Sequence, residues 1–356
     1  MDDPKLREYT HEFSAQEHCT ELVYRCEHCT GVLVYCTTIE QDSALRSVLT
    51  TTAPVTCTFQ IVTMSSLWPL CSLGHVEGVR EALAKGEDVN DQNDDNQTVL
   101  MYLAAICSRS ENHVTILRLL LEQPSIDVNV VDKQRVSALH VATQQGNVAA
   151  VKLLLADRRL DVNCGVSHHI TPLLMAASKP EKIEIFKLFL AEERFDMNWV
   201  SPNPSNGDIT VLMCASWNSN LEAVKLLLDD PRVEVNWMDS RGMSTLHVAA
   251  AKKNNVKIFE LLLAHRRVDV NCKRGPFNTT VLHMAAAKNN AEVVKLILAD
   301  SRFSSANALA GRERSALSIA AVKGYWATLK QLVHHPSVDL DLKHKNGKTV
   351  DDILRY

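Results

Sequence analysis

Ser244-Thr245-Leu246-His247-Val248-Ala249-Ala250 is one copy of a short pattern that recurs along this chain of 356 residues. Other copies differ at several positions but keep the leucine, which stands at Leu100, Leu139, Leu173, Leu212, Leu246, Leu282 and Leu317. Successive spacings of these leucines are 39, 34, 39, 34, 36 and 35 residues. A period near 34 residues indicates one supersecondary unit used many times. Such units stack in a row, and the row offers a broad surface to another macromolecule.

Each unit has three recognisable parts. The opener begins with Ser or Thr, whose side-chain oxygen can accept a hydrogen bond from a free helix N–H, so it predicts a helix start. An apolar run such as Val224-Lys225-Leu226-Leu227-Leu228 follows at helical spacing and predicts a second helix. The third part is Asp-Val-Asn or a near copy, as in Asp161-Val162-Asn163, and short polar side chains of this kind fix turns.

These three parts, recurring together at about 33–34 residues, resemble the ankyrin repeat. The resemblance covers roughly Ser66 to Tyr356. It implies an all-α solenoid in which each unit has two antiparallel helices and a projecting β-hairpin finger. We expect two parts in the chain: a non-repeat extension over residues 1–63, and an array over 64–356 of about eight units with a partial capping unit that starts at Thr349.

Three departures from the pattern predict local changes. An insertion near Ser108–Asn112 is expected to lengthen the turn between two helices. The segment from Trp199 to Asp208 predicts a longer finger, because it is rich in turn formers. After Phe303 the Asp-Val-Asn triplet is replaced by Ser304-Ser305-Ala306, so a looser turn is expected there.

Residues 1–63 hold Cys19, Cys26, Cys29 and Cys36. Cys26-Glu27-His28-Cys29 is a Cys-x-x-Cys knuckle between two strand-like runs, 21–25 and 32–35, and supplies half of a tetrahedral zinc site. The alternative is a disordered extension with stray thiols. A further alternative is that the biological chain begins at Met64, since Met64-Ser65-Ser66-Leu67-Trp68 would open the first unit naturally.

Composition limits the class of protein. The net charge of −4 and pI near 6.4 give no reason to expect nucleic acid or membrane as a partner. The chain has 10 cysteines, and those inside the array occupy positions where other units have different residues. They therefore predict thiols in a reducing compartment, cytoplasmic or nuclear, and not a disulfide framework. No secretory signal opens the chain. We expect a monomer that needs no cofactor.

Partner-binding residues follow from the resemblance, because the positions after the alanines of the first helix and the finger tips face the concave groove in such arrays, and we expect a protein partner to bind in that groove. The predicted site consists of Trp217, Asn218, Lys252, Lys253, Arg241, Lys288, Lys323 and Phe277. The lysines and Arg241 favour a partner with an acidic contact patch. Two alternatives stay open: Trp217 packs sideways on the next unit, on Lys253, and the lysines form an ordinary solvated helix face.

The openers' histidines, His140, His247 and His283, suggest structure more than ligand binding, because they recur with the unit and can bond between units. The sequence holds no Gly-x-Gly-x-x-Gly, no phosphate-binding Gly-x-x-x-x-Gly-Lys loop and no His-Glu-x-x-His. We therefore expect a non-enzymatic scaffold or adaptor, with no catalytic, metal or cofactor-binding residue in the array.

One alternative function is an adaptor whose N-terminal zinc module acts, ligase-like, on substrates that the array presents. Another is that the chain is a fragment of a larger membrane-associated or enzymatic protein. Asp351 and Asp352 weigh against the fragment, since they put charge where a further unit would have Leu-His, as an end cap requires.

Overall fold

The computed structural model describes residues 66–165, 170–202, 208–311 and 314–342, the strands at 22–25 and 33–36, and residues 349 and 352. The chain divides into two units, Met1–Glu87 and Asp88–Tyr356. The predicted boundary between residues 63 and 64 falls outside the described residues and stays a prediction. So do the zinc knuckle at Cys26 and Cys29 and the capping unit.

The first unit contains two short strands and one helix pair. Strands β1 (Leu22–Arg25) and β2 (Leu33–Cys36) are antiparallel, with Leu22 opposite Cys36. The two strand-like runs predicted from the sequence are thus confirmed to within a residue. Helix α1 (Leu67–Ser72) packs against α2 (Val76–Ala84), and the side chains of Leu70 and Val79 are buried.

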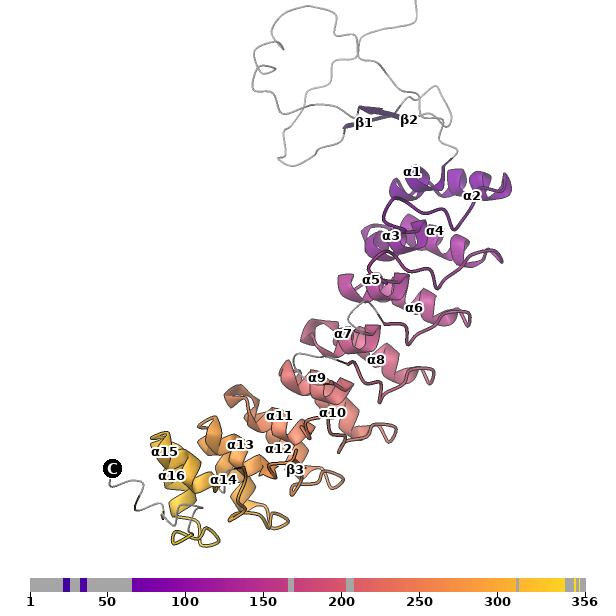
Figure 1. Ribbon diagram of the computed structural model, residues 1–356. Coiled ribbons are helices and arrows are strands. Elements are labelled where there is room, and N and C mark those ends of the chain that lie inside the picture. The colour runs from indigo at the N-terminus through magenta and orange to yellow at the C-terminus, as the bar shows by residue number, and fades with distance from the viewer. Residues whose placement is uncertain are drawn as a thin grey trace, which may run out of the picture. The chain divides into compact units, whose positions relative to one another are not determined.

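The second unit is a row of helix pairs, shown along the row in Figure 1. Each pair has a first helix, a turn and a second helix, and a finger leads to the next pair. The first helices are α3 (Val99–Ile106), α5 (Ala138–Gln145), α7 (Pro172–Ala177), α9 (Val211–Trp217), α11 (Thr245–Ala250), α13 (Val281–Ala287) and α15 (Ala316–Val322). The second helices are α4 (Glu111–Leu121), α6 (Val148–Ala156), α8 (Ile183–Ala191), α10 (Leu221–Asp229), α12 (Val256–Ala264), α14 (Ala291–Ala299) and α16 (Trp326–Val333).

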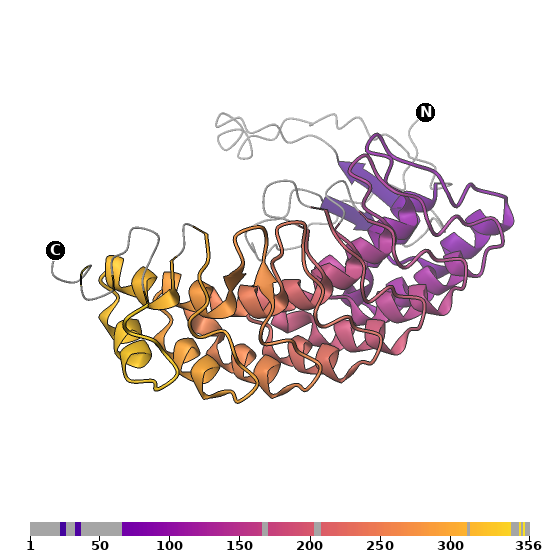
Figure 2. The ribbon, with the colours of Figure 1, turned by 60° about the horizontal axis from the view of Figure 1, so that its bottom comes forward.

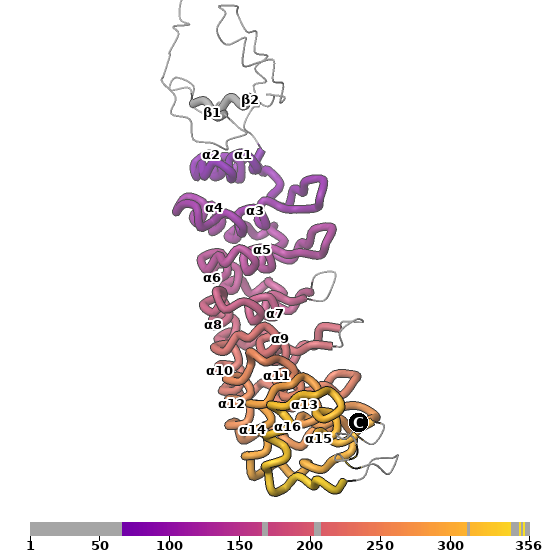
Figure 3. Tube along the Cα trace, turned by 90° about the vertical axis from the view of Figure 1, so that its left-hand side faces the viewer, coloured from indigo at the N-terminus to yellow at the C-terminus, as the bar shows by residue number. Residues whose placement is uncertain are grey.

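First helices contact first helices and second helices contact second helices along the row. Figures 2 and 3 show the resulting two rows, with the fingers projecting together to one side of the helices. The finger before α13 contains strands β3 (Lys273–Arg274) and β4 (Thr279–Thr280), which pair antiparallel. Three short 3₁₀ helices lie in the turns: η2 (Cys107–Arg109), η3 (Pro180–Lys182) and η4 (Lys253–Asn255). The expected all-α solenoid is confirmed.

Every first helix of the second unit starts where the openers predict. The side chains of Thr98, Ser137, Thr171, Thr210, Ser244, Thr280 and Ser315 each accept a hydrogen bond from the backbone N–H three residues later. These bonds satisfy N–H groups that a helix start otherwise leaves open. The seven repeated leucines are all buried, with 3% exposure or less, so they form the centre of the core. The small residues after them let adjacent first helices pack closely.

The asparagines of the Asp-Val-Asn triplets join each unit to the next. The Asn163 side chain donates from Nδ2 to the carbonyl of Arg194 (2.8 Å), and its Oδ1 accepts from the N–H of Asp196 (2.9 Å). The same pair of bonds, 2.6–2.9 Å long, is made by Asn90, Asn129, Asn198, Asn236, Asn271 and Asn307. One amide side chain therefore satisfies a donor and an acceptor of the following unit.

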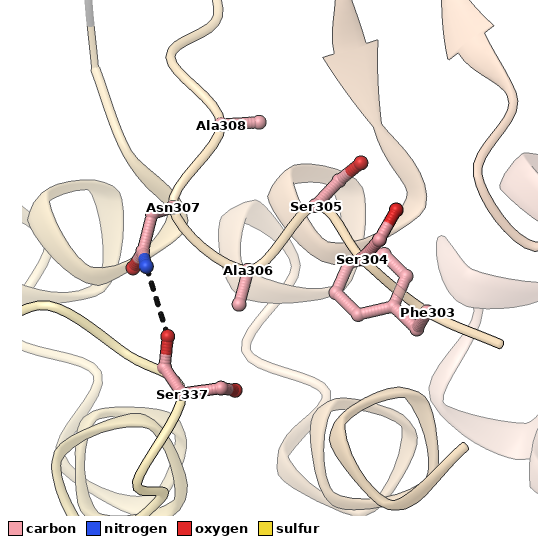
Figure 4. Close-up of a pocket in the computed structure, with 7 residues that line it drawn as sticks. All are labelled: Phe303, Ser304, Ser305, Ala306, Asn307, Ala308 and Ser337. Atoms are coloured by element: carbon pink, nitrogen blue, oxygen red, sulfur yellow. Dashed lines mark hydrogen bonds between the residues drawn. The ribbon is translucent and has the colours of Figure 1, made fainter. Parts of the chain in front are cut away.

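The unit after Phe303 keeps this connection in spite of its lost triplet. Ser304 donates its N–H to Asn271 Oδ1 (2.9 Å), and Asn307, one residue later than the pattern requires, donates to the carbonyl of Ser337 (2.9 Å). Figure 4 shows this bond beside a shallow depression of about 310 Å³ lined by residues 303–308 and Ser337. The turn is one residue longer than expected but remains bonded to both neighbours.

The two insertions are also visible. The residues near Ser108–Asn112 form η2 and the first turn of α4, which has 11 residues where α6 has 9. The long finger from Trp199 is closed at its base by paired backbone bonds of 3.0 Å between Ser201 and Ile209. Its tip, residues 203–207, lies outside the described residues.

The opener histidines are structural, as expected. His140, His247 and His283 each approach the Ser or Thr of their own opener through Nδ1, and Nε2 lies 3.0–3.1 Å from a carbonyl of the next finger. Burial lowers the pKa of all three side chains, that of His247 to about 4. Burial disfavours the charged imidazolium, so these side chains fold in the neutral form.

We predict that replacing Asn198 by Ala lowers the free energy of unfolding by about 1–3 kcal/mol, because the N–H of Glu234 and the carbonyl of Arg232 lose their partner. Urea unfolding measures the change. Asn218→Ala is the matched control, since the Asn218 side chain bonds only within its own helix, to the carbonyl and sulfur of Cys214. Equal losses in the two variants would contradict the role of Asn198 between units.

Acid should weaken the array through its histidines. The pKa of His247 lies near 4 in the folded chain and at about 6.5 when unfolded, so the unfolded chain takes up the proton first as the pH falls. Its stabilising contribution is complete above about pH 6.5 and is lost toward pH 4, with a loss of about 2 kcal/mol between pH 7 and pH 5.

The variant His247→Met tests the contribution of this histidine. Methionine fits the position, because Met213 is the equivalent residue of α9. The variant is less stable at pH 7, but its urea midpoint should depend less on pH than that of the native chain. His334→Met, which replaces an exposed histidine, is the matched control. An unchanged slope in His247→Met would refute the assignment.

Candidate partner-binding surface

The predicted site residues fall into two groups at opposite ends of the first helices. Most lie in what we call the turn row, defined as residues 217–220, 251–255, 287–290 and 322–326, which join the first and second helices from α9 to α16. Arg241 and Phe277 lie instead on fingers, before α11 and α13. First helices of six to eight residues separate the groups by about 9–12 Å at 1.5 Å per residue.

Trp217 and Lys252 are brought into direct contact. Trp217 ends α9, and 51% of its surface is exposed. The Lys252 ammonium lies 5.2 Å from the centre of the indole ring and donates a hydrogen bond to the Trp217 carbonyl. A cation over an indole face at this distance is attracted to it. The alternative that Trp217 packs sideways on the next unit is therefore confirmed, with the lysine corrected: Lys252 covers the ring, while Lys253, in η4, is exposed.

Lys323 makes a similar bridge two units further on. Its ammonium donates to the carbonyl of Ala287 (3.1 Å) and lies 5.5 Å from the ring centre of Tyr325. Lys182 does the same earlier in the array, donating to Thr143 and Gln144 carbonyls. These lysines thus fix one turn to the preceding one while keeping their charge on the surface. The Lys288 side chain, at the end of α13, is exposed.

The finger residues are supported from behind by close backbone contacts. A side chain at Gly242 would come within 2.3 Å of the Gly275 nitrogen, so the fingers carrying Arg241 and Phe277 touch at two glycines with positive φ. The carbonyl of Phe277 accepts from the N–H of Gly311 (2.8 Å), and its ring is 66% exposed. Phe277 is therefore an exposed aromatic ring on a braced hairpin. His168 and His169, also considered for the finger tips, lie outside the described residues.

Sequence reasoning missed Trp326, the most exposed large apolar side chain in the described part of the chain at 69%. It begins α16, and Val322, 64% exposed, ends α15 on the other side of the same turn. The signal was present in the sequence. The slot of Trp326 holds half-buried aliphatic residues in other units, namely Ile183, Leu221, Val256 and Ala291.

A second missed feature is an arginine in the loop after each second helix from α6 to α14. Arg194 donates to the carbonyl of Leu155 (2.7 Å) at the end of the preceding second helix, and it pairs with Glu192 two residues before it. Arg159, Arg232 and Arg302 bond Leu121, Leu190 and Leu263 and pair with Asp157, Asp230 and Asp300. These arginine hydrogen bonds lower the pKa of each acid. Guanidinium groups at helix C-termini donate to carbonyls that have no partner within the helix, and their positive charge interacts favourably with the negative end of the helix dipole.

His265 breaks this pattern. Arg267 bonds the carbonyls of Leu228, Asp230 and Val233, but the residue two before it is His265 and not an acid. The Nδ1 atom of His265 is buried and has no hydrogen-bond partner. Burial and then the charge of Arg267 lower its pKa, so it folds as the neutral imidazole. The joint at Arg267 therefore lacks the anion that the arginines at 159, 194, 232 and 302 have.

Replacing His265 by Asp should supply that anion and raise the free energy of unfolding by about 0.5–1 kcal/mol, as expected for a partly exposed pair. The gain should appear in urea unfolding at pH 7 and shrink at high salt. His335→Asp is the matched control, because Ser337 stands where the arginine would be. A gain of the same size in both variants would show that the arginine is not involved.

Metal and membrane sites do not appear in the described part of the chain. Among the residues described, no three His, Cys, Asp or Glu side chains come together to hold a metal ion, and none of the helices there is long and apolar enough to cross a bilayer. Cys71, Cys107, Cys164, Cys214 and Cys272 are free thiols, and burial raises the pKa of each. Raised values disfavour the reactive thiolate.

A comparison with known families matches this chain to a family model described as ankyrin repeats in three copies, over residues 67–166, 173–274 and 246–346. These ranges include every helix from α1 to α16 except for Pro172, the first residue of α7.

Proposed function

The chain belongs to the ankyrin repeat family, whose repeats form protein–protein interaction domains, and we propose that it is a non-enzymatic scaffold or adaptor whose partner protein contacts the turn row and the neighbouring fingers. The observation that carries the proposal is Trp217. Its ring is half exposed, yet Lys252 holds it in place on one side. A large aromatic side chain that is already ordered loses little entropy on binding and is a typical anchor.

The charge of the turn row supports an acidic contact patch on the partner. Its four turns contain Lys252, Lys253, Lys288 and Lys323 and no acidic residue. The chain as a whole carries a net charge of −4, so these lysines stand out locally. Opposed charges steer association and select partners. The partner then contacts Trp217 and Asn218 at one end of the row, with Arg241 and Phe277 adding contacts from the fingers.

The wider setting follows from the same features. Free thiols at five described positions suit the reducing cytoplasm or nucleus. We propose that the chain acts as a monomer, with the partner's identity set by side chains on the two surfaces rather than by the shared fold.

A pull-down from the source cell tests this function. The native chain is compared with the triple variant Trp217→Ala, Lys252→Ala, Lys253→Ala. Lys257→Ala with Lys295→Ala is the control, because it removes two exposed lysines from the second helices α12 and α14 instead. We expect partners that bind the native chain and the control but are weakened about tenfold or more by the triple variant, which is the loss of one aromatic anchor.

Salt separates the electrostatic contribution. Raising the salt from about 0.05 M to 0.5 M shortens the screening length severalfold and should weaken capture. A partner set unchanged in the triple variant would refute the proposed surface, and capture that is indifferent to salt would refute the acidic patch.

A further inference from the structure

We propose that the turn row binds an extended, acid-rich segment of the partner that carries a large apolar residue near each end. One of these residues contacts Trp217, and the other contacts Val322 and Trp326. The inference rests on the proposed function and specifies the chemistry of the bound segment.

The second anchor is built like the first. Val322 and Trp326 flank a tight turn in which Gly324 has a φ of +64°. Lys323 fixes that turn by its bond to the Ala287 carbonyl and its position over Tyr325. Lys252 covers the Trp217 ring itself, whereas Lys323 covers Tyr325, so at the second anchor it is the turn carrying Trp326 that is fixed before any partner arrives.

The fold itself does not require these bulky side chains. The slot of Trp217 is filled by Ala251 and Ala287 in the next two units, and the slot of Trp326 is filled by Ala291 in α14. Val322 also shares the slot of Ala287. Exposed aromatic and branched residues at positions where alanine suffices are better explained by contact with another molecule.

Between the anchors the surface is uniformly basic. The turns at 251–255 and 287–290 present Lys252, Lys253 and Lys288, and their remaining residues are alanines and asparagines. A segment that crosses these turns meets three ammonium groups and no carboxylate. Carboxylates are the side chains that match this charge, so the middle of the bound segment is expected to be rich in Asp and Glu.

The length of the segment follows from the spacing of the units. Trp217 ends α9 and Trp326 begins α16, so the anchors are three units apart. Packed helices lie about 8–10 Å apart, which places the anchors about 24–30 Å from each other. An extended chain rises about 3.3 Å per residue, so about seven to nine residues separate the two apolar side chains.

Lysines beside exposed tryptophans also suit an anionic lipid surface, but acidic neighbours disfavour it. Glu222 and Glu292 lie exposed in the first turns of α10 and α14, just beyond the turn row. A flat anionic surface would meet these carboxylates together with the lysines. A single extended chain is narrow enough to follow the lysines alone.

The test is a selection of random 16-residue peptides on the full chain, displayed on phage, followed by fluorescence anisotropy on the selected peptides. We expect sequences with two large apolar residues about seven to nine positions apart and acids between them. Trp217→Ala and Trp326→Ala should each weaken binding about tenfold or more. Val333→Ala, which removes an exposed apolar side chain from the end of α16, outside the turn row and the fingers, should change it less than about twofold.

Several results would overturn the inference. These are a selection without enriched sequences, peptides with a single anchor, and peptides whose affinity survives Trp326→Ala. Sedimentation with vesicles of phosphatidylcholine and phosphatidylserine that requires Trp326 would overturn it in favour of lipid. A cellular partner that needs Trp217 and Lys252 but not Trp326 would leave the scaffold function standing and remove only the second anchor. If neither Trp217→Ala nor Trp326→Ala loses a cellular partner, both the proposed binding surface and the second anchor are refuted.

Discussion

The structure depends on one repeated interaction, made by an asparagine side chain between two units. The amide donates to a carbonyl of the following unit and also accepts from an N–H of that following unit. From Asn90 to Asn307 this amide occurs at each step along the described row. Hairpins of two short helices cannot bury their apolar faces alone, and stacking solves that problem only if the backbone loops between units also find partners. The asparagines supply those partners, so the burial of leucines and the bonding of loops reinforce each other.

Two other kinds of hydrogen bond between units lie at different places along each unit. Histidines of the openers bond near the fingers, and arginines bond the ends of the second helices. The proposed binding surface lies away from these histidine and arginine bonds. It has joints of its own, because Lys252 and Lys323 bond the carbonyls of Trp217 and Ala287 in the preceding unit and also add charge to the surface. Lys252 in addition covers the Trp217 ring, which explains how an exposed ring can be held still in a row of short turns.

Much of the fold could be predicted from the sequence, because local rules and tertiary packing agree in the openers. Each opener Ser or Thr caps its helix, and each repeated leucine is buried. Prediction from the sequence pattern failed where the side chain that makes a contact lies one residue away from the expected position. Asn307 makes the unit-to-unit bonds one residue late, so a search for the triplet missed it. Lys252 rather than Lys253 covers Trp217. Lys252 precedes η4 in an extended backbone conformation, whereas Lys253 is the first residue of η4. Trp326 stands where other units have half-buried aliphatic residues, a difference that the sequence shows but that was read only once its exposure was known.

The acceptors in these joints have a consequence for how such a chain can change. Asn163 and Arg194 bond to main-chain oxygens, which every amino acid provides. At these joints a neighbouring unit is thus recognised by its backbone path, whatever side chains it carries there. Units can be duplicated, deleted or exchanged without new partners for the asparagine or the arginine, provided that the buried helix faces still pack, and the outward positions are left free to diverge. Recognition of new ligands can evolve by recombining ready-made modules while the architecture stays intact.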